Sequence, residues 1–279
     1  MIFLHLTNGF GNNLFQYIAA RLLAEKHNKK LIVIPPSKTY YGTDELKKIN
    51  VQFSSAERKG NLAHVNDTNY LAAFKPEYSE FSFVMCGYFE DYRYYIDHIE
   101  KIKTWFPQPS EANNKDLVIH LRAGDRLFYK NEFDTKPTAE HFKNAIKNFN
   151  FDGLHIVSDM PKWEHINTKD LNHMSFHYNV PKKQRVEAQK SVDYFNSLVD
   201  CFSKYNPVFK KRSVADDFQF IRGFKNILFQ HGTMSWWAAA LSEAERVGVY
   251  GPWRPWKGAS NKNLSNVPID SWFKWGEDV

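Results

Sequence analysis

Beyond residue 115, short apolar runs alternate with longer segments of helical periodicity, and this alternation restricts the fold more than any other feature. Helices are expected at 137–149 and 184–205, where apolar side chains recur at a 3.6-residue period. Strands are expected at 118–121, 154–157, 174–178, 226–230 and 246–250. Short buried strands separated by helices are typical of a parallel sheet with crossover helices, so the predicted class is α/β.

The first third of the chain shows the same alternation. Strands are expected at 2–6, 31–34 and 83–86, and the turn at 7–13 leads into a helix that Asn12 or Asn13 can cap. A glycine turn at this place leaves free N–H groups and the positive end of a helix beyond the sheet. Most such turns only connect a strand to a helix, so the turn alone is a weak signal. Residues 37–82 show no readable period.

The clearest change of composition lies at 107–115, PQPSEANNK, which we interpret as a linker. It separates a first α/β domain at 1–106 from a second at 116–251. Residues 252–279, rich in Trp and Pro, form a C-terminal extension that we expect to run back over the first domain.

Composition excludes several classes of protein. The net charge of +6 comes from scattered positive residues, which disfavours a nucleic-acid-binding face. Aromatic residues make up 16% of the chain, which suits either sugar stacking or a dense core, and we favour the core. Cys86 and Cys201 match neither a disulfide framework nor a metal site, and both are expected to be buried thiols. With no secretory signal and no long apolar window, the expected location is cytoplasmic, without a membrane span.

The main candidate site is the end of the strand at 118–121 and the turn after it. These carry the charged or titratable residues His120, Arg122, Asp125 and Arg126. A cation at the carboxyl end of a buried strand is how α/β proteins present a charge to an anionic ligand. Arg122 carries a permanent charge and can donate in pairs to phosphate oxygens. A structural ion pair of Arg122 with Asp125 around Gly124 is an equally weighted alternative from these residues alone.

A second candidate stretch, 231–241, follows another strand and opens a helix. Thr233 and Ser235 place hydroxyls in its first turn, where they can donate to an anion beside the helix N-terminus. Trp236 and Trp237 are expected in the core. The aromatic stretch 87–95 either forms a platform for a sugar ring or packs on the sheet, and the residues do not decide between the two.

Taken together, these stretches resemble the motifs of the α-1,2-fucosyltransferases (glycosyltransferase family 11) and, more distantly, those of the α-1,6- and protein O-fucosyltransferases. The similar segments occur in family order along nearly the whole chain. They are Phe10-Gly11-Asn12-Asn13-Leu14-Phe15-Gln16-Tyr17, Gly87-Tyr88-Phe89 with Tyr94, His120-Leu121-Arg122-Ala123-Gly124-Asp125, Ser158-Asp159, and Asp216-Asp217-Phe218 through Trp236-Trp237-Ala238.

The resemblance implies a GT-B-like fold in which two Rossmann-like domains face a cleft, with 1–106 on the acceptor side and 116–251 binding the donor. It implies an inverting, metal-independent transfer of fucose from GDP-β-L-fucose to a glycan hydroxyl, with galactoside O2 the expected acceptor. No cofactor and no metal ligand are expected. Arg122 and Asp125 would be catalytic. The donor-binding residues it implies are Gly11, Asn12, His120, Arg122, Ser158, Asp159, Asp216, Asp217, Thr233 and Ser235.

The chemistry of the residues agrees with this expectation. Departure of a nucleoside diphosphate needs positive charge at the leaving phosphates, and the sequence offers Arg122 but no Asp-x-Asp pair for a metal. Departures from the family pattern include Ala123, Arg126, Asn13, Met160 and His231-Gly232. They leave open another nucleotide deoxyhexose as donor, or an inactive sugar- or nucleotide-binding relative. The candidates for a general base are Asp125, Glu132, Asp134 and Asp91.

Overall fold

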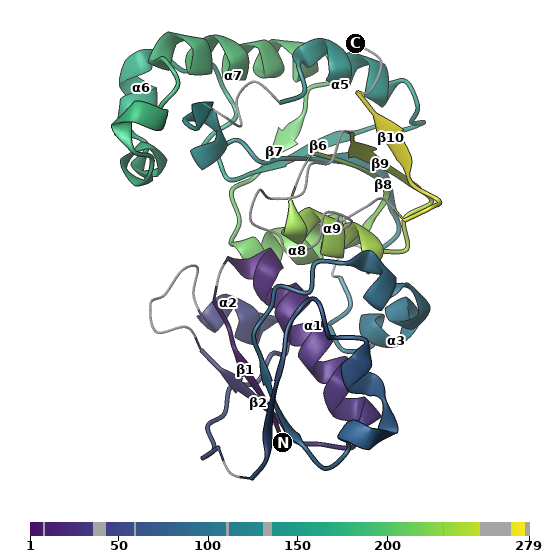
Figure 1. The fold of residues 1–279 in the computed structure, drawn as a ribbon. Coiled ribbons are helices and arrows are strands. Elements are labelled where there is room, and N and C mark those ends of the chain that lie inside the picture. Colours follow the sequence, from purple (N-terminus) through teal and green to yellow (C-terminus); the bar gives the residue numbers. More distant parts are fainter. Residues whose placement is uncertain are drawn as a thin grey trace.

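A computed structural model of the chain describes residues 1–7, 9–35, 43–58, 60–109, 112–130, 136–230, 232–251 and 269–276. These residues form two parallel β-sheets, each covered by helices, in two halves that lie one above the other in Figure 1. The expected α/β class with two Rossmann-like halves is confirmed.

The first half contains a four-stranded sheet in the order β2-β1-β4-β3, all parallel. Its strands are β1 (Ile2–His5), β2 (Leu31–Ile34), β3 (Leu62–Val65) and β4 (Ser82–Met85). The strand order reverses between β1 and β4, which is where open α/β sheets bind ligands. Helix α1 (Phe10–Lys26) starts at this edge with Gly9 as its N-cap. Asn12 and Asn13 therefore lie inside the first turn, which corrects the expectation that one of them caps the helix.

The stretch 37–82 contains more regular structure than its sequence indicates. Its described part includes α2 (Thr43–Lys48), strand β3, and the 3₁₀ helices η1 (Ala72–Phe74) and η2 (Pro76–Tyr78). After β4 come η3 (Tyr92–Tyr94), η4 (Ile96–His98) and α3 (Ile99–Lys103). The stretch between β4 and residue 103 is thus made of short helical turns.

The second half contains a six-stranded parallel sheet in the order β10-β9-β8-β5-β6-β7. The strands are β5 (Asn114–Leu121), β6 (Leu154–Ser158), β7 (Val208–Phe209), β8 (Phe224–Phe229), β9 (Arg246–Tyr250) and β10 (Phe273–Trp275). Strand β5 begins inside the segment interpreted as a linker. Residues 269–276 extend this second sheet through β10, whereas 252–268 lie outside the described residues.

One strand prediction in this half is wrong. Residues 174–178 do not join the sheet, because Ser175–Asn179 forms the 3₁₀ helix η6. The alternation of Met174, Phe176 and Tyr178 imitates a strand, but Met174 is buried in a small apolar cluster outside the sheet while Tyr178 is 71% exposed.

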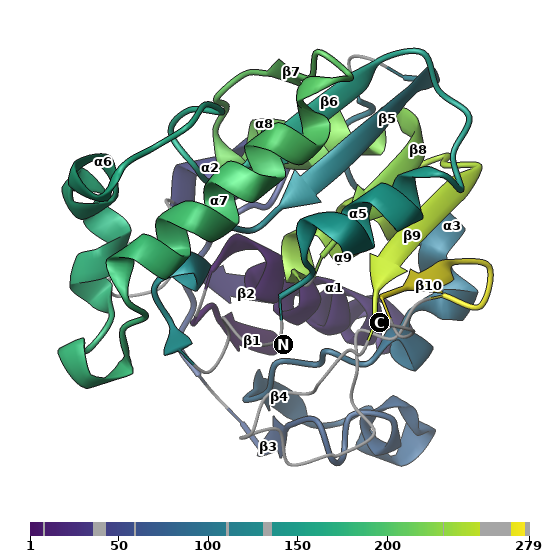
Figure 2. The same ribbon diagram turned by 90° about the horizontal axis from the view of Figure 1, so that it is seen from above.

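Helices cover both faces of the second sheet. Figure 1 shows α5 (Ala139–Ile146), α6 (Thr168–His173) and α7 (Ala188–Ser203) above it, and α8 (Val214–Arg222) and α9 (Thr233–Ala240) between it and the first half. Figure 2 shows α5 and α7 crossing over the strands. No helix among the described residues is both long and apolar enough to cross a membrane.

The two halves share one apolar core. Phe15 on α1 packs on Trp237 of α9 with ring centres 4.8 Å apart, and Tyr95 contacts the same indole at 5.0 Å. Trp236 and Trp237 are fully buried, which confirms that they belong to the core. Of the two thiols, Cys201 is buried as expected, but Cys86 is exposed. Packing of α1 on α9 brings the carboxyl edges of the two sheets together.

Candidate active site

The loop after β5 carries the cation that the sequence analysis placed first. Arg122 directly follows β5, the strand beside which the order of the second sheet reverses. Its side chain is 39% exposed, and its contact with Asp125 is loose, 3.7 Å between Nη2 and Oδ1. Much of the guanidinium is therefore accessible to a ligand. This geometry favours the ligand-binding interpretation over a purely structural ion pair.

The residues after β6 give this loop its shape. One carboxylate oxygen of Asp159 accepts hydrogen bonds from the N–H groups of Ala123 (2.9 Å) and Gly124 (2.7 Å). The Ser158 hydroxyl is buried and donates to the carbonyl of Leu121 at 2.7 Å. Both residues were expected to line the donor pocket. In the structure the Ser158 hydroxyl and the Asp159 carboxylate form hydrogen bonds that fix the loop carrying Arg122. Contact of either residue with the donor stays a prediction.

Two further cations extend this cluster, and no role was predicted for either: Arg126 interacts with the charge of Arg122, and Lys136 interacts with that of Arg126. Burial and repulsion from Arg122 lower the pKa of Arg126 to about 10. Burial and repulsion from Arg126 lower the pKa of Lys136 to about 7. Arg126 was named in the sequence analysis among the charged residues after the strand, and it lies in the turn η5 (Asp125–Leu127), whereas no sequence pattern marks Lys136.

Such a cluster of cations repels itself wherever water is partly excluded. Asp125 and Asp159 offset part of that repulsion, since both act on Arg126 and on Lys136. A bound anion with two or more charges would offset the rest. The cluster therefore has the electrostatics of a phosphate site.

The two adjacent aspartates at the start of α8 have different environments. Asp217 is buried, and burial raises its pKa to about 7 even though Arg212 and Lys211 act in the opposite direction. Lys211 is anchored beside β6, where its Nζ donates to the carbonyl of Asp159 at 2.8 Å. Asp217 therefore belongs to the same group of charges as the Arg122 loop.

Asp216 is exposed and faces the first half of the chain. It accepts a 2.7 Å hydrogen bond from Ser213 and lies 3.5 Å from the Nζ of Lys48. The hydrogen bond from Ser213 is the main reason why the pKa of Asp216 is lowered. A groove of about 530 Å³ runs past it, lined by Lys210, Lys211, Arg212, Ser213, Asp216, Gln219 and Phe220.

The hydroxyl groups in the first turn of α9 contact other side chains of the protein. Thr233 Oγ1 donates to Asn12 Oδ1 at 2.7 Å, and Ser235 Oγ lies 2.5 Å from His120 Nδ1. Burial, followed by the charge of Arg122, lowers the pKa of His120 to about 3, so the ring is neutral. The structure thus corrects the expectation of free hydroxyls at positions 233 and 235. Contact of these residues with a phosphate stays a prediction.

The two halves are in close contact at Gly11. A Cβ added there would lie 2.2 Å from the Met234 backbone nitrogen and 2.4 Å from Thr233 Oγ1. Gly11 and Asn12 therefore join α1 to α9, and the structure gives them a role in assembly of the site.

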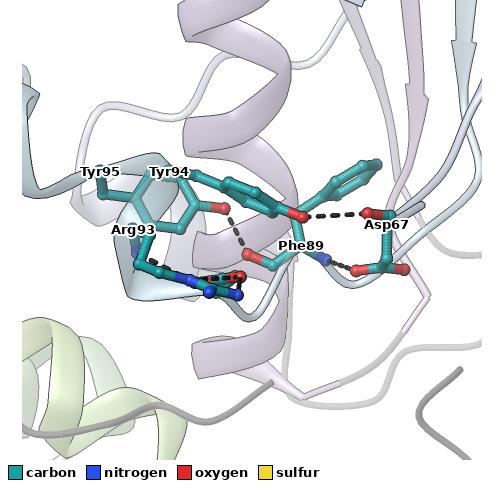
Figure 3. A network of polar contacts seen from close by, with 6 residues as sticks. Asp67, Phe89, Arg93, Tyr94 and Tyr95 are labelled. Carbon is teal, nitrogen blue, oxygen red and sulfur yellow. Dashed lines mark hydrogen bonds and ion pairs between the residues drawn. The ribbon is translucent and has the colours of Figure 1, made fainter. Parts of the chain in front are cut away.

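The aromatic stretch after β4 is mainly a packed structure. Phe89 and Tyr95 are fully buried, and a network of hydrogen bonds surrounds them (Figure 3). Asp91 accepts from the backbone N–H of Arg93 and forms an ion pair with its guanidinium. Asp91 is thereby occupied, which removes it as a candidate base. Of the other candidates, Glu132 and Asp134 lie outside the described residues, and only Asp125 stands in the site.

Among the described residues, no group of three or more His, Cys, Asp or Glu side chains is arranged to hold a metal ion. The cations of the Arg122 loop can neutralise a phosphate.

No model of a known protein family matches the chain, and no curated protein matches its sequence. A solved structure that is similar is the crystal structure of the NodZ α-1,6-fucosyltransferase soaked with GDP-fucose. The match covers 88% of this chain and 93% of that one, at 11% sequence identity and a TM-score of 0.37. A likeness of this size establishes neither a family nor a function, so the function is inferred from the residues of the site.

Proposed function

We propose that this chain is a glycosyltransferase that moves L-fucose from GDP-β-L-fucose to a glycan hydroxyl, with inversion at the anomeric carbon and without a metal ion. The resemblance of its motifs to the α-1,2-fucosyltransferases supports the donor and makes galactoside O2 the expected acceptor. Another nucleotide deoxyhexose is the alternative donor.

One observation carries the proposal. Arg122 is accessible at the carboxyl end of β5 and is backed by the buried cations Arg126 and Lys136. Three cations around a strand end suit a diphosphate, whose negative charge increases when it departs from a nucleotide sugar as a nucleoside diphosphate. Nucleoside diphosphate sugars are one class of metabolite in which a diphosphate is the leaving group.

The proposed chemistry follows from this charge. As the bond between the sugar C1 and the β-phosphate oxygen breaks, its electron pair stays with the phosphate. Arg122 stabilises the developing charge, with Arg126 and Lys136 behind it. Asp125, 3.7 Å from Arg122, makes only a loose ionic contact with the guanidinium, which leaves it accessible to the phosphate. The acceptor oxygen attacks C1 from the opposite face and loses its proton.

Two departures from the family pattern raised the alternative of an inactive binding protein. Ala123 and Met160 are only 4% and 0% exposed, and both belong to the apolar cluster beneath the Arg122 loop. Both residues therefore pack within the fold, while Arg122 beside them stays accessible, which supports the enzyme over the inactive relative.

A panel of nucleotide sugars tests the proposal. Stabilisation of the protein against heat by GDP and GDP-fucose, unchanged by EDTA, is expected, together with formation of a fucosylated product from GDP-fucose and lactose. Thermal stabilisation by UDP-sugars alone, abolished by EDTA, would contradict the proposed donor and the metal-independent mechanism. Binding of GDP-fucose without transfer or hydrolysis would support the inactive relative.

A further inference from the structure

The loop after β4 carries Glu90, whose carboxyl group forms no hydrogen bond or ion pair with any other described residue. This loop lies beside the loop after β1, at the point where the strand order of the first sheet reverses. Gln16 of α1 ties the two loops together, because its Nε2 donates to the Gly87 carbonyl and to Thr7 Oγ1, each at 3.0 Å. The loop is therefore fixed at the edge of the sheet that faces the second half.

Phe89 is held in an unusual backbone conformation. Its φ of +57° lies in the left-handed region, which a bulky residue adopts only when its surroundings enforce it. Both of its backbone groups are held: the N–H donates to Asp67 Oδ1 at 2.6 Å, and the carbonyl accepts from the Tyr95 hydroxyl at 2.5 Å. Tyr94 donates in turn to the Asp67 carbonyl at 2.9 Å, as Figure 3 shows.

The residues on both sides of position 90 are therefore fixed. Before it, Gly87 lies so close to Asp67 that an added Cβ would be 2.5 Å from Oδ2. After it, Asp91 caps η3 and pairs with Arg93. Strain and a dense network of this kind occur where a protein positions a functional group.

Glu90 is the residue that this network positions. Its side chain is partly buried and makes no hydrogen bond with any described residue. Burial, and then the nearby charge of Asp67, raise its pKa to about 7. Even partial burial of a carboxyl group without a partner is costly.

We propose that Glu90 binds the acceptor hydroxyl and acts as the general base of the transfer, an inference that rests on the proposed function. The carboxylate takes the proton of the hydroxyl, and the oxygen forms its bond to C1 of the donor sugar. The bond from C1 to the phosphate oxygen breaks, and its electron pair leaves with the nucleoside diphosphate. Glu90 stands on the first half and Arg122 on the second, so the two groups approach the sugar from different domains.

The other carboxylates near the site have partners. Asp125 lies against Arg122, and Asp159 accepts from two backbone N–H groups. Asp91 is paired with Arg93. Glu90 differs from these residues. Among the described side chains at this edge of the first sheet, its carboxyl group is the one that contacts neither a cation nor a backbone N–H group.

The test compares Glu90→Gln and Glu90→Asp with the wild type and with Glu80→Gln, an exposed control on the same half. GDP binding is measured by calorimetry, and turnover is measured both as transfer from GDP-fucose to lactose and as donor hydrolysis by water. Glu90→Gln should bind GDP as tightly as the wild type, with a kcat at least about 100-fold lower. Its thermal midpoint should not fall, since a neutral amide replaces a poorly solvated acid.

The pH profile separates a base from a structural residue. In the wild type and in Glu90→Asp, kcat/KM should decrease below about pH 7, because the base becomes protonated. Glu90→Gln should not show this decrease. Wild-type turnover in Glu90→Gln would overturn the assignment, and so would a lowered thermal midpoint with weakened GDP binding. A wild-type protein that neither binds GDP nor turns over the donor would instead overturn the proposed function, and the role of Glu90 with it.

Discussion

The Thr233 hydroxyl donates a 2.7 Å hydrogen bond to the side-chain oxygen of Asn12, and this bond joins the first turns of α9 and α1. The two residues are 221 positions apart in the chain. Each helix starts at the carboxyl edge of its own sheet, so the bond fixes the two edges against each other. Substitutions at this contact should therefore act on the whole site.

Gly11→Ala should be destabilising, because its Cβ would lie 2.2 Å from the backbone nitrogen of Met234. Overpacking of this kind costs about 1–3 kcal/mol, measurable as a loss in the free energy of unfolding in urea. Gly9→Ala is the matched control, since nothing lies within 4 Å of its added Cβ. Equal stability of the two variants would show that α1 and α9 are not in close contact.

Asp159→Ala should weaken both the fold and GDP binding. It removes the acceptor of two backbone N–H groups in the Arg122 loop, and each unsatisfied buried donor costs about 1–3 kcal/mol. Asp152→Asn, an exposed substitution two residues before β6, is the control. If Asp159→Ala bound GDP with wild-type affinity, the loop would not depend on this carboxylate.

The features predicted best from sequence are those encoded locally. Short apolar runs such as 31–34 and 246–250 became strands at the expected positions, because continuous apolar runs of that length are buried on both faces of a parallel sheet. Strand β3 was missed, since its residues Leu62 and His64 are exposed at the sheet edge and leave no apolar run. Two-residue β7 carries too little sequence to be recognised.

In the site, the position of Arg122 followed from the end of its strand, but the partners of the other residues did not. A hydroxyl in the first turn of a helix looks available in a sequence. The groups that occupy Thr233 and Ser235 are Asn12 and His120, more than a hundred residues away. Burial of Lys136 is likewise a property of the assembled fold, so nothing local distinguishes this lysine from an exposed one.

The stability of the protein should fall as pH rises from about 4.5 to 7. Glu90 and Asp217 both have a pKa raised to about 7 in the folded state, so the folded chain holds protons that the unfolded chain has already lost. The pKa rises from 4.5 to about 7 for Glu90 and from 3.8 to about 7 for Asp217, so each group should contribute about 3.5 to 4.5 kcal/mol, at about 1.4 kcal/mol for each unit of pKa. His120 has a lowered pKa, so its contribution to the stability of the folded protein increases as pH rises from about 3 to 6.5.

The double variant Glu90→Gln/Asp217→Asn isolates the effect of the two carboxyl groups. The free energy of unfolding in urea is measured for the double variant and for the wild type at pH 5 and at pH 7.5. It should decrease less between these two pH values in the double variant than in the wild type. An identical pH dependence in both proteins would show that these carboxyl groups titrate normally.

GDP affinity should depend on the protonation of Lys136. Its pKa of about 7 means that the amine loses its charge as pH rises from 6.5 to 8.5, which weakens its attraction for a diphosphate. Dissociation constants measured across this range should show a weakening in the wild type that Lys136→Met lacks. Lys130→Met, an exposed change nearby, should follow the wild type; a Lys136→Met curve parallel to the wild type would exclude the amine from the site.

The central claim is that the guanidinium of Arg122 binds a diphosphate, and calorimetric titration of GDP into Arg122→Ala measures this directly. Lys115→Ala, which removes an exposed cation from the opposite end of β5, is the control for net charge at the same ionic strength. A charged hydrogen bond contributes about 1.5–3 kcal/mol, so Arg122→Ala should bind GDP at least about tenfold more weakly while Lys115→Ala binds as the wild type does. Equal GDP affinity in Arg122→Ala and the wild type would contradict the claim.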